Sequence, residues 1–354
     1  MTHTALWWGR FDENYSRNRI LRRQLIELGW RIVDFRPHFS GLADWEARFK
    51  KLPKPDLVWV PCFRQRDLAA ASRWARSQNV PLLFDPLISA YDKQVFERGK
   101  LVEGSAKAIK LLNWERDLFR RADILLADTS EHARFFVESL GVRPDLIHVV
   151  LVGAEEALFK PGPVSVKSAG EELEALFYGS FIPLQGAMVI VEAARLYQGP
   201  PLRWTLLGAG PEQPACKQAA AGLANVGFES WTNYAELPER IRRADILLGV
   251  FGATPKAGRV IPNKVFQALA CGKPVVTRVG AAYPDALVGT AGEGLSWVPA
   301  GDAAALAKIM AELANNPEKL PDLGRRARAV YERYFSEAVI EASLARALHS
   351  LSLD

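Results

Sequence analysis

The sequence predicts an α/β protein built from two doubly wound domains, each with a parallel sheet. In both halves of the chain, short apolar runs alternate with segments of helical periodicity, which is typical of parallel sheets covered by helices on both faces. The length of 354 residues suits about two domains of ordinary size. A stretch rich in proline and glycine, from 159 to about 169, predicts a linker. We therefore expect domains over residues 1–160 and 161–335 and a closing segment over 336–354.

The first half contains six short apolar runs that predict buried strands. Helices are expected in the intervals between them. In the first interval Leu21, Leu25 and Leu28 share one helical face, and Gly29 follows as a stop. The expected strands cover residues 5–9, 30–35, 56–60, 81–84, 124–127 and 147–151.

The second half repeats this alternation of strands and helices. Ligands of open parallel sheets bind beyond the carboxyl ends of the strands. Two such domains would face each other across a cleft, so we expect the functional site there. The expected strands cover residues 175–178, 204–207, 225–228, 246–250, 274–277 and 295–298, and a helical pattern follows from 335 to 351.

The segment at 258–276 is the most informative part of the chain. It predicts a loop, a helix that starts at Pro262 and stops at Gly272, and then a buried strand. The first turn of that helix, residues 263–265, presents unpaired backbone amides and the positive end of the helix dipole, and it contains Lys264. Such a helix start suits an anion, and a diphosphate in particular.

Two glycine-containing loops follow strands of the second half. Gly179 and Gly186 bracket the first loop, where small residues let the backbone approach a phosphate closely, although a plain strand–helix turn is the competing interpretation. The second loop holds Gly208 and Gly210. Gln213 stands where a complete dinucleotide-binding fingerprint has its third glycine, so a dehydrogenase site is poorly supported.

Two further side chains are candidates in this half. Glu212 either accepts a hydrogen bond from a ligand or is a charge in the first turn of a helix. Trp231 follows the third strand of the half, where it either stacks on a nucleobase or belongs to an exposed turn.

Six segments occur in an order that resembles the nucleotide-sugar glycosyltransferases of family 4, which have the GT-B fold. The resemblance implies two Rossmann-like domains facing a cleft, with a C-terminal helix that crosses back to the first domain; packing on the second domain is the alternative. It also implies a UDP- or GDP-type sugar donor on the second domain, an acceptor on the first, and retention of anomeric configuration without a metal. The segments cover residues 152–161, 177–186, 204–212, 225–228, 237–246 and 258–276.

The chain departs from the family pattern at four positions. The family has two glutamates separated by seven residues, where this sequence has Arg259 and Gln267. The resemblance implies that Gln267 holds the ribose, and that Arg259 meets the diphosphate or an anionic sugar. The family also clamps the diphosphate with an arginine and a lysine at the positions of Ser180 and Gln185. Lys264 and its cationic neighbours would replace the missing charge.

In the first half, a polar and basic loop follows the first strand, where the family has a glycine-rich loop that meets donor and acceptor. Only Gly9 remains of those glycines. Ser16 is a candidate helix cap, and Arg17 and Arg19 would then lie near a helix start, where cations are disfavoured unless they bind an anion. Asp85 follows a strand and either orients the acceptor hydroxyl, accepts its proton, or caps a turn.

The excess positive charge lies entirely in the first half. Residues 1–160 hold 26 Lys and Arg against 21 Asp and Glu, whereas residues 161–354 hold 19 of each. This excess predicts an anionic partner, such as a phospholipid surface, a lipid-linked phosphate or an acidic glycan; solvated helix faces explain it equally well. Residues 105–121 fit an amphipathic helix packed on its own sheet or one lying on a membrane. Nucleic acid is disfavoured because no recognition motif accompanies the charge.

Several classes of protein are excluded by other features. Cys62, Cys216 and Cys271 are far apart and predict buried thiols of a cytoplasmic protein. The five histidines form no metal-binding pattern, and no apolar run reaches the ~20 residues that span a bilayer. No signal peptide opens the chain. We expect a cytoplasmic enzyme, with peripheral membrane association as an option, and no cofactor or metal beyond the nucleotide sugar it uses as substrate.

The favoured function is glycosyl transfer from a nucleotide diphosphate sugar to an acceptor hydroxyl, in cell-surface glycan or glycolipid synthesis. The alternative is a catalytically degenerate nucleotide-sugar-binding or regulatory protein, because the family's glutamates and clamp are replaced. An epimerase of the same fold would need more cleft carboxylates. The predicted residues are Asp85, Arg259 and Lys264 for catalysis; Gly179, Ser180, Gln185, Gly186, Gly208, Gly210, Glu212, Trp231, Pro262, Asn263, Val265 and Gln267 for the donor; and Gly9, Arg10, Tyr15, Ser16, Arg17 and Arg19 for the acceptor.

Overall fold

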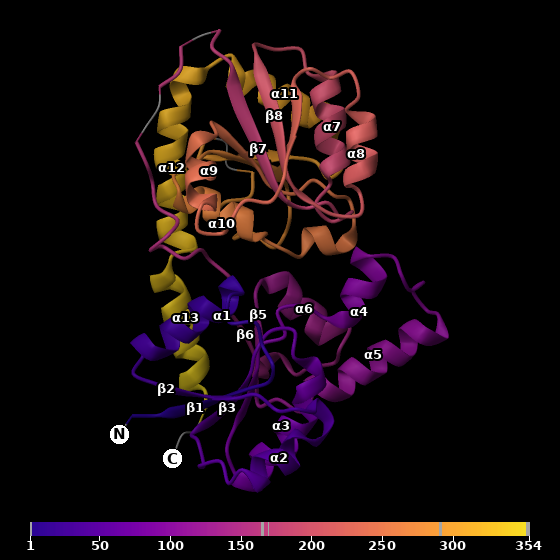
Figure 1. The fold of residues 1–354 in the computed structure, drawn as a ribbon, viewed down its shortest axis with the longest axis vertical. Helices are drawn as coiled ribbons and strands as arrows, with labels where there is room; N and C mark the ends of the chain where they lie inside the picture. The colour runs from indigo at the N-terminus through magenta and orange to yellow at the C-terminus, as the bar shows by residue number, and fades with distance from the viewer. Residues whose placement is uncertain (1, 164–165, 169, 290–291, 352–354) are drawn as a thin grey trace. The chain divides into compact units, whose positions relative to one another are not determined.

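The computed structural model divides into two compact units, which are coloured along the chain in Figure 1. It describes residues 2–163, 166–168, 170–289 and 292–351. The first unit comprises Met1–Gly153 with Glu337–Asp354, and the second comprises Ala154–Ser336. The division therefore falls just before Ala154, ahead of the expected boundary after residue 160. Residues 164–165 and 169 of the expected linker, and 352–354 of the expected closing segment, lie outside the described residues.

The first unit contains a six-stranded parallel sheet in the order β2-β1-β3-β4-β5-β6. Its central strands are short and wholly buried, as parallel strands covered on both faces are. All six strands expected in this half are confirmed within three residues at each end. Their bounds are β1 Thr4–Trp8, β2 Arg31–Phe35, β3 Leu57–Val60, β4 Leu82–Phe84, β5 Ile124–Ala127 and β6 Ile147–Val149.

Helices cover both faces of this sheet because side chains alternate along each strand. Leu6 and Trp8 belong to one core cluster, whereas Ala5 and Trp7 belong to the other. The helices are α1 Ser16–Glu27, α2 Ala43–Phe49, α3 Leu68–Gln78, α4 Ala90–Asp92, α5 Ala106–Phe119, α6 Ser130–Glu138 and α13 Glu337–His349, with 3-10 turns at Ser40–Leu42, Gln65–Asp67 and Pro144–Leu146 and a π-helical turn at Lys93–Glu97.

The C-terminal helix α13 belongs to the first unit although the whole second unit precedes it in sequence. Ile340 and Leu344 of α13 are buried with Leu21 and Leu25 of α1 in one core cluster. Figure 1 shows α13, in yellow, beside the indigo α1. Helix α5 also packs on its own unit, since Leu118 and the following residue join the core cluster on the opposite face of the sheet.

The second unit holds another six-stranded parallel sheet, in the order β12-β11-β10-β7-β8-β9. Again all six expected strands are confirmed, and β7 and β8 extend further than expected, to eight residues each. The strands are β7 Leu173–Ser180, β8 Leu202–Ala209, β9 Val226–Glu229, β10 Ile246–Leu248, β11 Val275–Arg278 and β12 Leu295–Val298.

One face of the second sheet buries apolar side chains from β7, β8 and β10 against α7, α8 and α11. On the other face, α10 contacts β10, β11 and α12. These helices are α7 Ala187–Leu196, α8 Gln213–Ala219, α9 Leu237–Arg243, α10 Asn263–Ala270, α11 Ala303–Ala314 and α12 Leu320–Tyr334, with 3-10 turns at Pro255–Gly258 and Pro317–Lys319.

Candidate functional site

The carboxyl ends of β7 and β8 come unusually close together in the second unit. Gly179 and Gly208 are register partners in this parallel pair. A Cβ atom added to Gly208 would lie 2.1 Å from the Gly179 carbonyl oxygen, so only glycine allows this approach. Next along the chain, Gly210 lies against the backbone of Phe181. Two glycines predicted in different loops therefore meet backbone to backbone, with the Lys264 and Gln185 side chains against Gly179.

The loop after β7 turns into α7 at Gly186, which has a positive φ of 69° and forms the N-cap of that helix. A Cβ at Gly186 would lie 2.5 Å from the Gly252 nitrogen, so this loop packs directly on the loop that follows β10. Ser180, at the end of β7, is exposed. The glycine-bracketed loop is thus held in place by neighbouring backbone and leaves polar groups at its outer side.

The second glycine loop closes onto α8. Gln213, which stands at the third glycine position, donates through Nε2 to the Gly208 carbonyl at 2.8 Å. Glu212 is partly buried, its backbone nitrogen donates to the Phe181 carbonyl at 3.0 Å, and burial raises the pKa of its carboxyl. The side chain that breaks the dinucleotide fingerprint is therefore used to fix the loop.

Helix α10 begins as predicted, at an uncapped and partly exposed turn. Pro262 is its N-cap, with φ −74° and ψ 149°, and no side chain bonds the first amides. Among the described residues, the backbone amides of Asn263 and Lys264 have no hydrogen-bond acceptor. Pro262 and Asn263 are partly exposed. The helix start therefore offers free donors and the positive end of the helix dipole to an anion.

Lys264 is buried, which we did not expect of a residue that meets the diphosphate. Its Nζ donates to Oε1 of Gln185 at 2.6 Å and lies 3.6 Å from the centre of the Phe177 ring. Burial lowers the pKa of this ammonium well below its usual range. The structure thus joins two residues that were predicted separately for the donor site.

Gln267 is also buried, with 4% of its surface exposed. Its Oε1 accepts a hydrogen bond from the Tyr178 hydroxyl at 2.8 Å, which uses one of its two acceptor sites and fixes the orientation of the amide. Tyr178 was missed by the sequence reasoning, although its place directly before Gly179 in a strand was a usable signal. Val265, another predicted donor residue, offers a ligand neither group: its side chain is fully buried and its backbone amide donates to the Pro262 carbonyl at 2.9 Å.

Arg278 is a second residue that the sequence reasoning missed. It ends β11, and its guanidinium donates to the Gly252 carbonyl at 2.8 Å and lies near Gly258. Among the described residues no carboxylate pairs with it. Burial accordingly lowers its pKa. Arg278 places a cationic group at the same sheet edge as the glycine loops.

The remaining donor candidates lie around this edge. Arg259 ends the 3-10 turn before α10 and is partly exposed. Trp231 is 52% exposed in the loop after β9, as a base-stacking side chain or an exposed turn residue would be. The structure leaves both interpretations of Trp231 open to experiment.

In the first unit, Arg17 and Asp85 form a fully buried ion pair. Arg17 Nε lies 2.9 and 2.8 Å from the two Asp85 oxygens, and its Nη1 donates to the carbonyls of Val150 and Leu151. Burial raises the pKa of the Asp85 carboxyl, and the guanidinium acts against that effect. This contradicts the expectations that Asp85 presents a free carboxylate and that Arg17 binds an external anion: each satisfies the other.

The other acceptor candidates are arranged along the start of α1. Ser16 is not the expected cap, because Tyr15 is the N-cap and no side chain bonds the first amides. Gly9 is buried against the Arg64 and Asp67 side chains. Arg10 is exposed, and Arg19 and Tyr15 are partly exposed.

Two strained backbone positions lie at the carboxyl ends of β3 and β4 in the first sheet. Phe63 and Leu87 follow β3 and β4 and have φ values of 64° and 59°, although neither is a glycine. The Phe63 nitrogen donates to the Pro86 carbonyl, so the two strained loops touch. The Phe63 ring meets Tyr15 edge-on at 5.0 Å. Strained backbone positions of this kind concentrate at functional sites, which supports a ligand-binding edge here.

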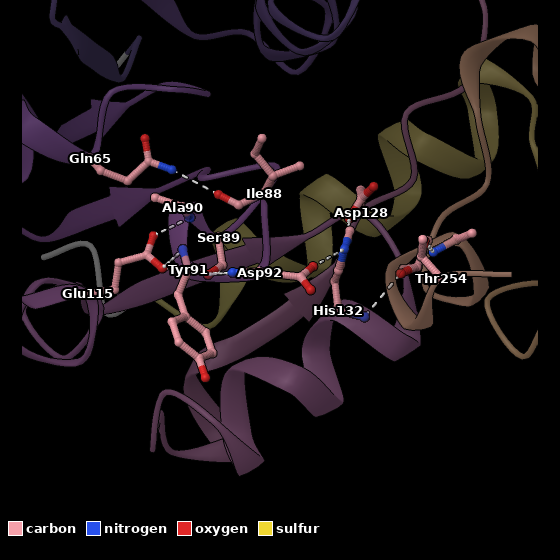
Figure 2. A network of polar contacts seen from close by, with 12 residues as sticks. Gln65, Ile88, Ser89, Ala90, Tyr91, Asp92, Glu115, Asp128, His132 and Thr254 are labelled. Carbon is pink, nitrogen blue, oxygen red and sulfur yellow. Dashed lines mark hydrogen bonds and ion pairs between the residues drawn. The ribbon is translucent and has the colours of Figure 1, made fainter. Parts of the chain in front are cut away.

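A buried polar network, shown in Figure 2, continues from this edge. His132 on α6 lies between two carboxylates: its Nδ1 bonds Asp128, which follows β5, and its Nε2 is 3.6 Å from Asp92 of α4. Glu115 of α5 accepts hydrogen bonds from the Ser89 hydroxyl and from the two backbone amides that follow. Of these residues the sequence reasoning named only Asp92, as a less certain companion of Asp85, and it missed the network because Ser89 and Glu115 are 26 residues apart in the chain.

The described residues contain no group of three or more His, Cys, Asp or Glu side chains arranged to hold a metal ion. In that same part of the chain, none of the helices combines the length and the apolar character that a membrane crossing requires. All three cysteines are buried and free, as expected.

Comparison with known proteins matches both units to glycosyltransferase families. A family model described as "Glycosyl transferase 4-like domain" matches residues 8–153, and one described as "Glycosyl transferases group 1" matches residues 172–316. The D-inositol 3-phosphate glycosyltransferase of Thermomonospora curvata is 27% identical, over 71% of this chain and 61% of its own length. The chain spans about 60% of the length of the first curated relatives it matches.

Solved structures share the fold along almost the whole chain. HepE from Anabaena, in a complex with UDP-glucose, matches with a TM-score of 0.72 at 16% identity, over 99% of this chain and 100% of its own. Sucrose-phosphate synthase from Thermosynechococcus elongatus matches with a TM-score of 0.73 at 16% identity, over 98% of each chain. With a matched family model on each unit and two parallel sheets of this kind, the chain belongs to the family 4 glycosyltransferases of GT-B type.

Proposed function

We propose that this protein transfers a sugar from a nucleoside diphosphate sugar to an acceptor hydroxyl, with retention of configuration at the anomeric carbon. The observation that carries the proposal is the sheet edge of the second unit. There the glycine-closed ends of β7 and β8 lie beside the uncapped first turn of α10. Backbone amides at a helix start, with no side chains in the way, are suited to a diphosphate. The glycosyltransferase family of both units supports this use.

Stabilisation of the leaving diphosphate would come from fixed donors and from nearby cations. The amides of Asn263 and Lys264 would bond its oxygens, and Arg278 and Arg259 would supply positive charge from the same edge. Lys264 would act through Gln185, whose amide it holds. Groups that are already oriented before the reaction stabilise developing charge at little cost in reorganisation. No step in this account needs a metal.

The nucleoside would be uridine or guanosine, with the ribose near the Gln267 amide nitrogen. The UDP-glucose complex of HepE supports uridine. The acceptor would be a hydroxyl compound held by the first unit, near the strained loops at Phe63 and Leu87. The relative named for D-inositol 3-phosphate supports an acceptor with an anionic group, which agrees with the basic excess of residues 1–160.

A peripheral membrane contact of the first unit is also part of the proposal, and would suit a lipid-linked acceptor. Phe39, Leu42, Trp45 and Phe49 are between 61% and 88% exposed on and beside the short helix α2. The last three are spaced to share one helical face, and Arg48 lies 6.0 Å from the Trp45 ring. Exposed aromatic side chains with adjacent cations are typical of interfacial helices. If Trp45→Glu leaves co-sedimentation with anionic vesicles unchanged, the proposed membrane contact through these residues is contradicted.

The donor site is tested by removing one backbone amide. Asn263→Pro deletes the amide of the first helical residue, a position that tolerates proline, and Pro262 already has the extended backbone that precedes proline. Asn263→Ala is the matched control, since it removes the side chain and keeps the amide. We expect Asn263→Pro to weaken UDP binding about tenfold, the effect of one hydrogen bond to a charged group, in isothermal titration. Equal affinities of the two variants would contradict the site.

A nucleotide-sugar-binding protein without transfer activity is the second candidate. It is favoured by Arg259 and Gln267 at the positions of the family's glutamates and by the engagement of Asp85 with Arg17. The two candidates separate when the protein is incubated with UDP- and GDP-sugars and a panel of acceptors. Release of nucleoside diphosphate that depends on the acceptor supports transfer. Binding without release, over the whole panel, supports the second candidate.

A further inference from the structure

A cavity of about 210 Å³ lies at the opposite end of the second sheet from the glycine loops. Its walls come from the segments that precede β7, β10 and β11 and from the start of α12. Five cationic side chains line it, against a single carboxylate. They are Lys167, Arg242, Lys273, Arg325 and Arg328, and the carboxylate is Asp245.

Most of these cations have partners that hold them in place. Lys167 Nζ donates to Asp245 Oδ2 at 2.7 Å, which uses the one carboxylate of the cavity. Arg328 donates to the Ala270 carbonyl at 2.8 Å and so covers the negative end of α10. Arg242 and Arg325 bond the acidic residues Glu239 and Asp322, which are not part of the cavity wall.

Lys273 differs from the other four. Among the described residues its ammonium has no hydrogen bond or ion pair, and its side chain is partly buried. Burial lowers its pKa, the nearby Asp245 carboxylate acts against this effect, and the charges of Lys167 and Arg242 add to it. The other four cations are each paired with a carboxylate, so Lys273 is the positive charge of this cavity that an anion would stabilise most.

We propose that this cavity binds a small phosphate-bearing anion, with Lys273 as the residue that contacts it. The volume suits a phosphate, a pyrophosphate or a phosphorylated sugar. The side of α12 from Leu320 to Arg328 lies in the wall, next to the C-terminal end of α10, so the positive charge of the cavity comes from its side chains. The cavity thus adds a second anion site to the one proposed for the donor diphosphate.

The two sites are distinct because they lie at opposite ends of the same strands. Ser180 ends β7 at the donor edge, whereas Lys167 bonds the Glu172 carbonyl just before β7 begins. Eight residues of strand span roughly 25 Å at about 3.3 Å per residue. Helix α10 begins at Asn263 at the donor edge and ends at Ala270. Lys273, three residues further on, lines the cavity.

The site is tested with inorganic pyrophosphate, in protein saturated with UDP so that the donor site is filled. The variants are Lys273→Met and, as a control, Lys308→Met, which removes an exposed lysine of α11 outside the cavity. We expect pyrophosphate to raise the melting temperature of the unmodified protein and of Lys308→Met, and to bind Lys273→Met about tenfold more weakly. Without pyrophosphate, Lys273→Met should be at least as stable as the unmodified protein, because an unpaired charge is removed.

Two further variants keep the outcome decisive. Arg325→Gln, at an exposed rim residue, should also weaken pyrophosphate, whereas Lys264→Met at the donor edge should not. Pyrophosphate affinity that is equal in Lys273→Met and Lys308→Met, or no binding at millimolar concentration, overturns the proposal. Binding that is lost in Lys264→Met alone assigns the anion to the donor site instead. Failure of UDP to bind would contradict the proposed function while leaving the Lys273 comparison interpretable.

Discussion

Asp85→Asn separates a structural role of this carboxylate from a catalytic one. In the structure Asp85 accepts hydrogen bonds from Arg17 through both oxygens, and neither side chain is exposed. Asparagine keeps the shape and one acceptor oxygen but loses the charge. If the role of Asp85 is structural, the substitution should therefore lower the free energy of unfolding. Turnover should fall only in proportion to the fraction of protein that remains folded.

The expected magnitude follows from the geometry of the pair. At the 2.8 Å between Arg17 Nη2 and Asp85 Oδ1, the Coulomb attraction is about 6 kcal/mol for an effective dielectric constant near 20. Part of it is offset by the cost of burying both charges. Breaking buried pairs destabilises proteins by about 3–5 kcal/mol. We expect about 3 kcal/mol for Asp85→Asn and up to about 5 kcal/mol for Arg17→Met, which leaves the carboxylate without a donor.

The assay is urea unfolding followed by tryptophan fluorescence, because seven of the ten tryptophans lie in the first unit. Arg134→Met is the control, since Arg134 and Glu131 form a more exposed pair on α6 that should contribute less than about 1 kcal/mol. Loss of acceptor-dependent turnover by Asp85→Asn at an unchanged urea midpoint would refute the structural role and restore the catalytic one. An Arg17→Met effect no larger than that of Arg134→Met would refute the magnitude.

Three other predictions follow from single contacts. Gly208→Ala should cost about 1–3 kcal/mol more than Gly222→Ala in thermal unfolding, because both glycines have positive φ but only Gly208 is packed against a backbone oxygen; equal effects would count against it. Burial lowers the pKa of Lys264 in the folded protein, so the free energy of unfolding should rise with pH from that folded pKa up to the unfolded value near 10.4. Lys264→Met should lack this rise. Melting temperatures of the two proteins that change in parallel from about pH 6 to 10 would contradict the prediction. His132→Phe removes the group between two buried carboxylates, so it should destabilise the first unit by about 2–4 kcal/mol in urea unfolding; a loss below about 1 kcal/mol would be inconsistent with this.

Much of the fold could be predicted because its signals are local. All twelve strands lie where short apolar runs predicted them, and α10 begins after Pro262 and ends before Gly272 as expected. A run of buried-type residues marks a parallel strand wherever it occurs, and proline and glycine restrict or release the backbone by their own geometry. The division between the units falls before Ala154 and not after residue 160. A stretch rich in proline and glycine indicates a connection, but it does not show at which residue the contacts of the chain pass from one unit to the other.

The side-chain pairs of the site could not be predicted in this way. Arg17 and Asp85 were each assigned to ligand chemistry, and the structure joins them across 68 residues. Lys264 was expected to be available to a ligand, and it is buried beneath Gln185, 79 residues away in sequence. Sequence patterns give residue types and local spacing. They do not indicate which polar groups will satisfy one another after the chain has folded.

The sequence alone therefore determined the alternation of strands and helices, the glycine loops and the helix start at Pro262, since each depends on neighbours within a few residues. The tertiary structure decided which charged groups remain available to a ligand. Arg17 and Asp85 neutralise each other inside the first unit, whereas Arg278 and Lys273 have no carboxylate bound to them among the described residues. The physical reason is that a fully buried charge is costly without a partner, and the partner that the fold provides for Arg17 is 68 residues away in the chain.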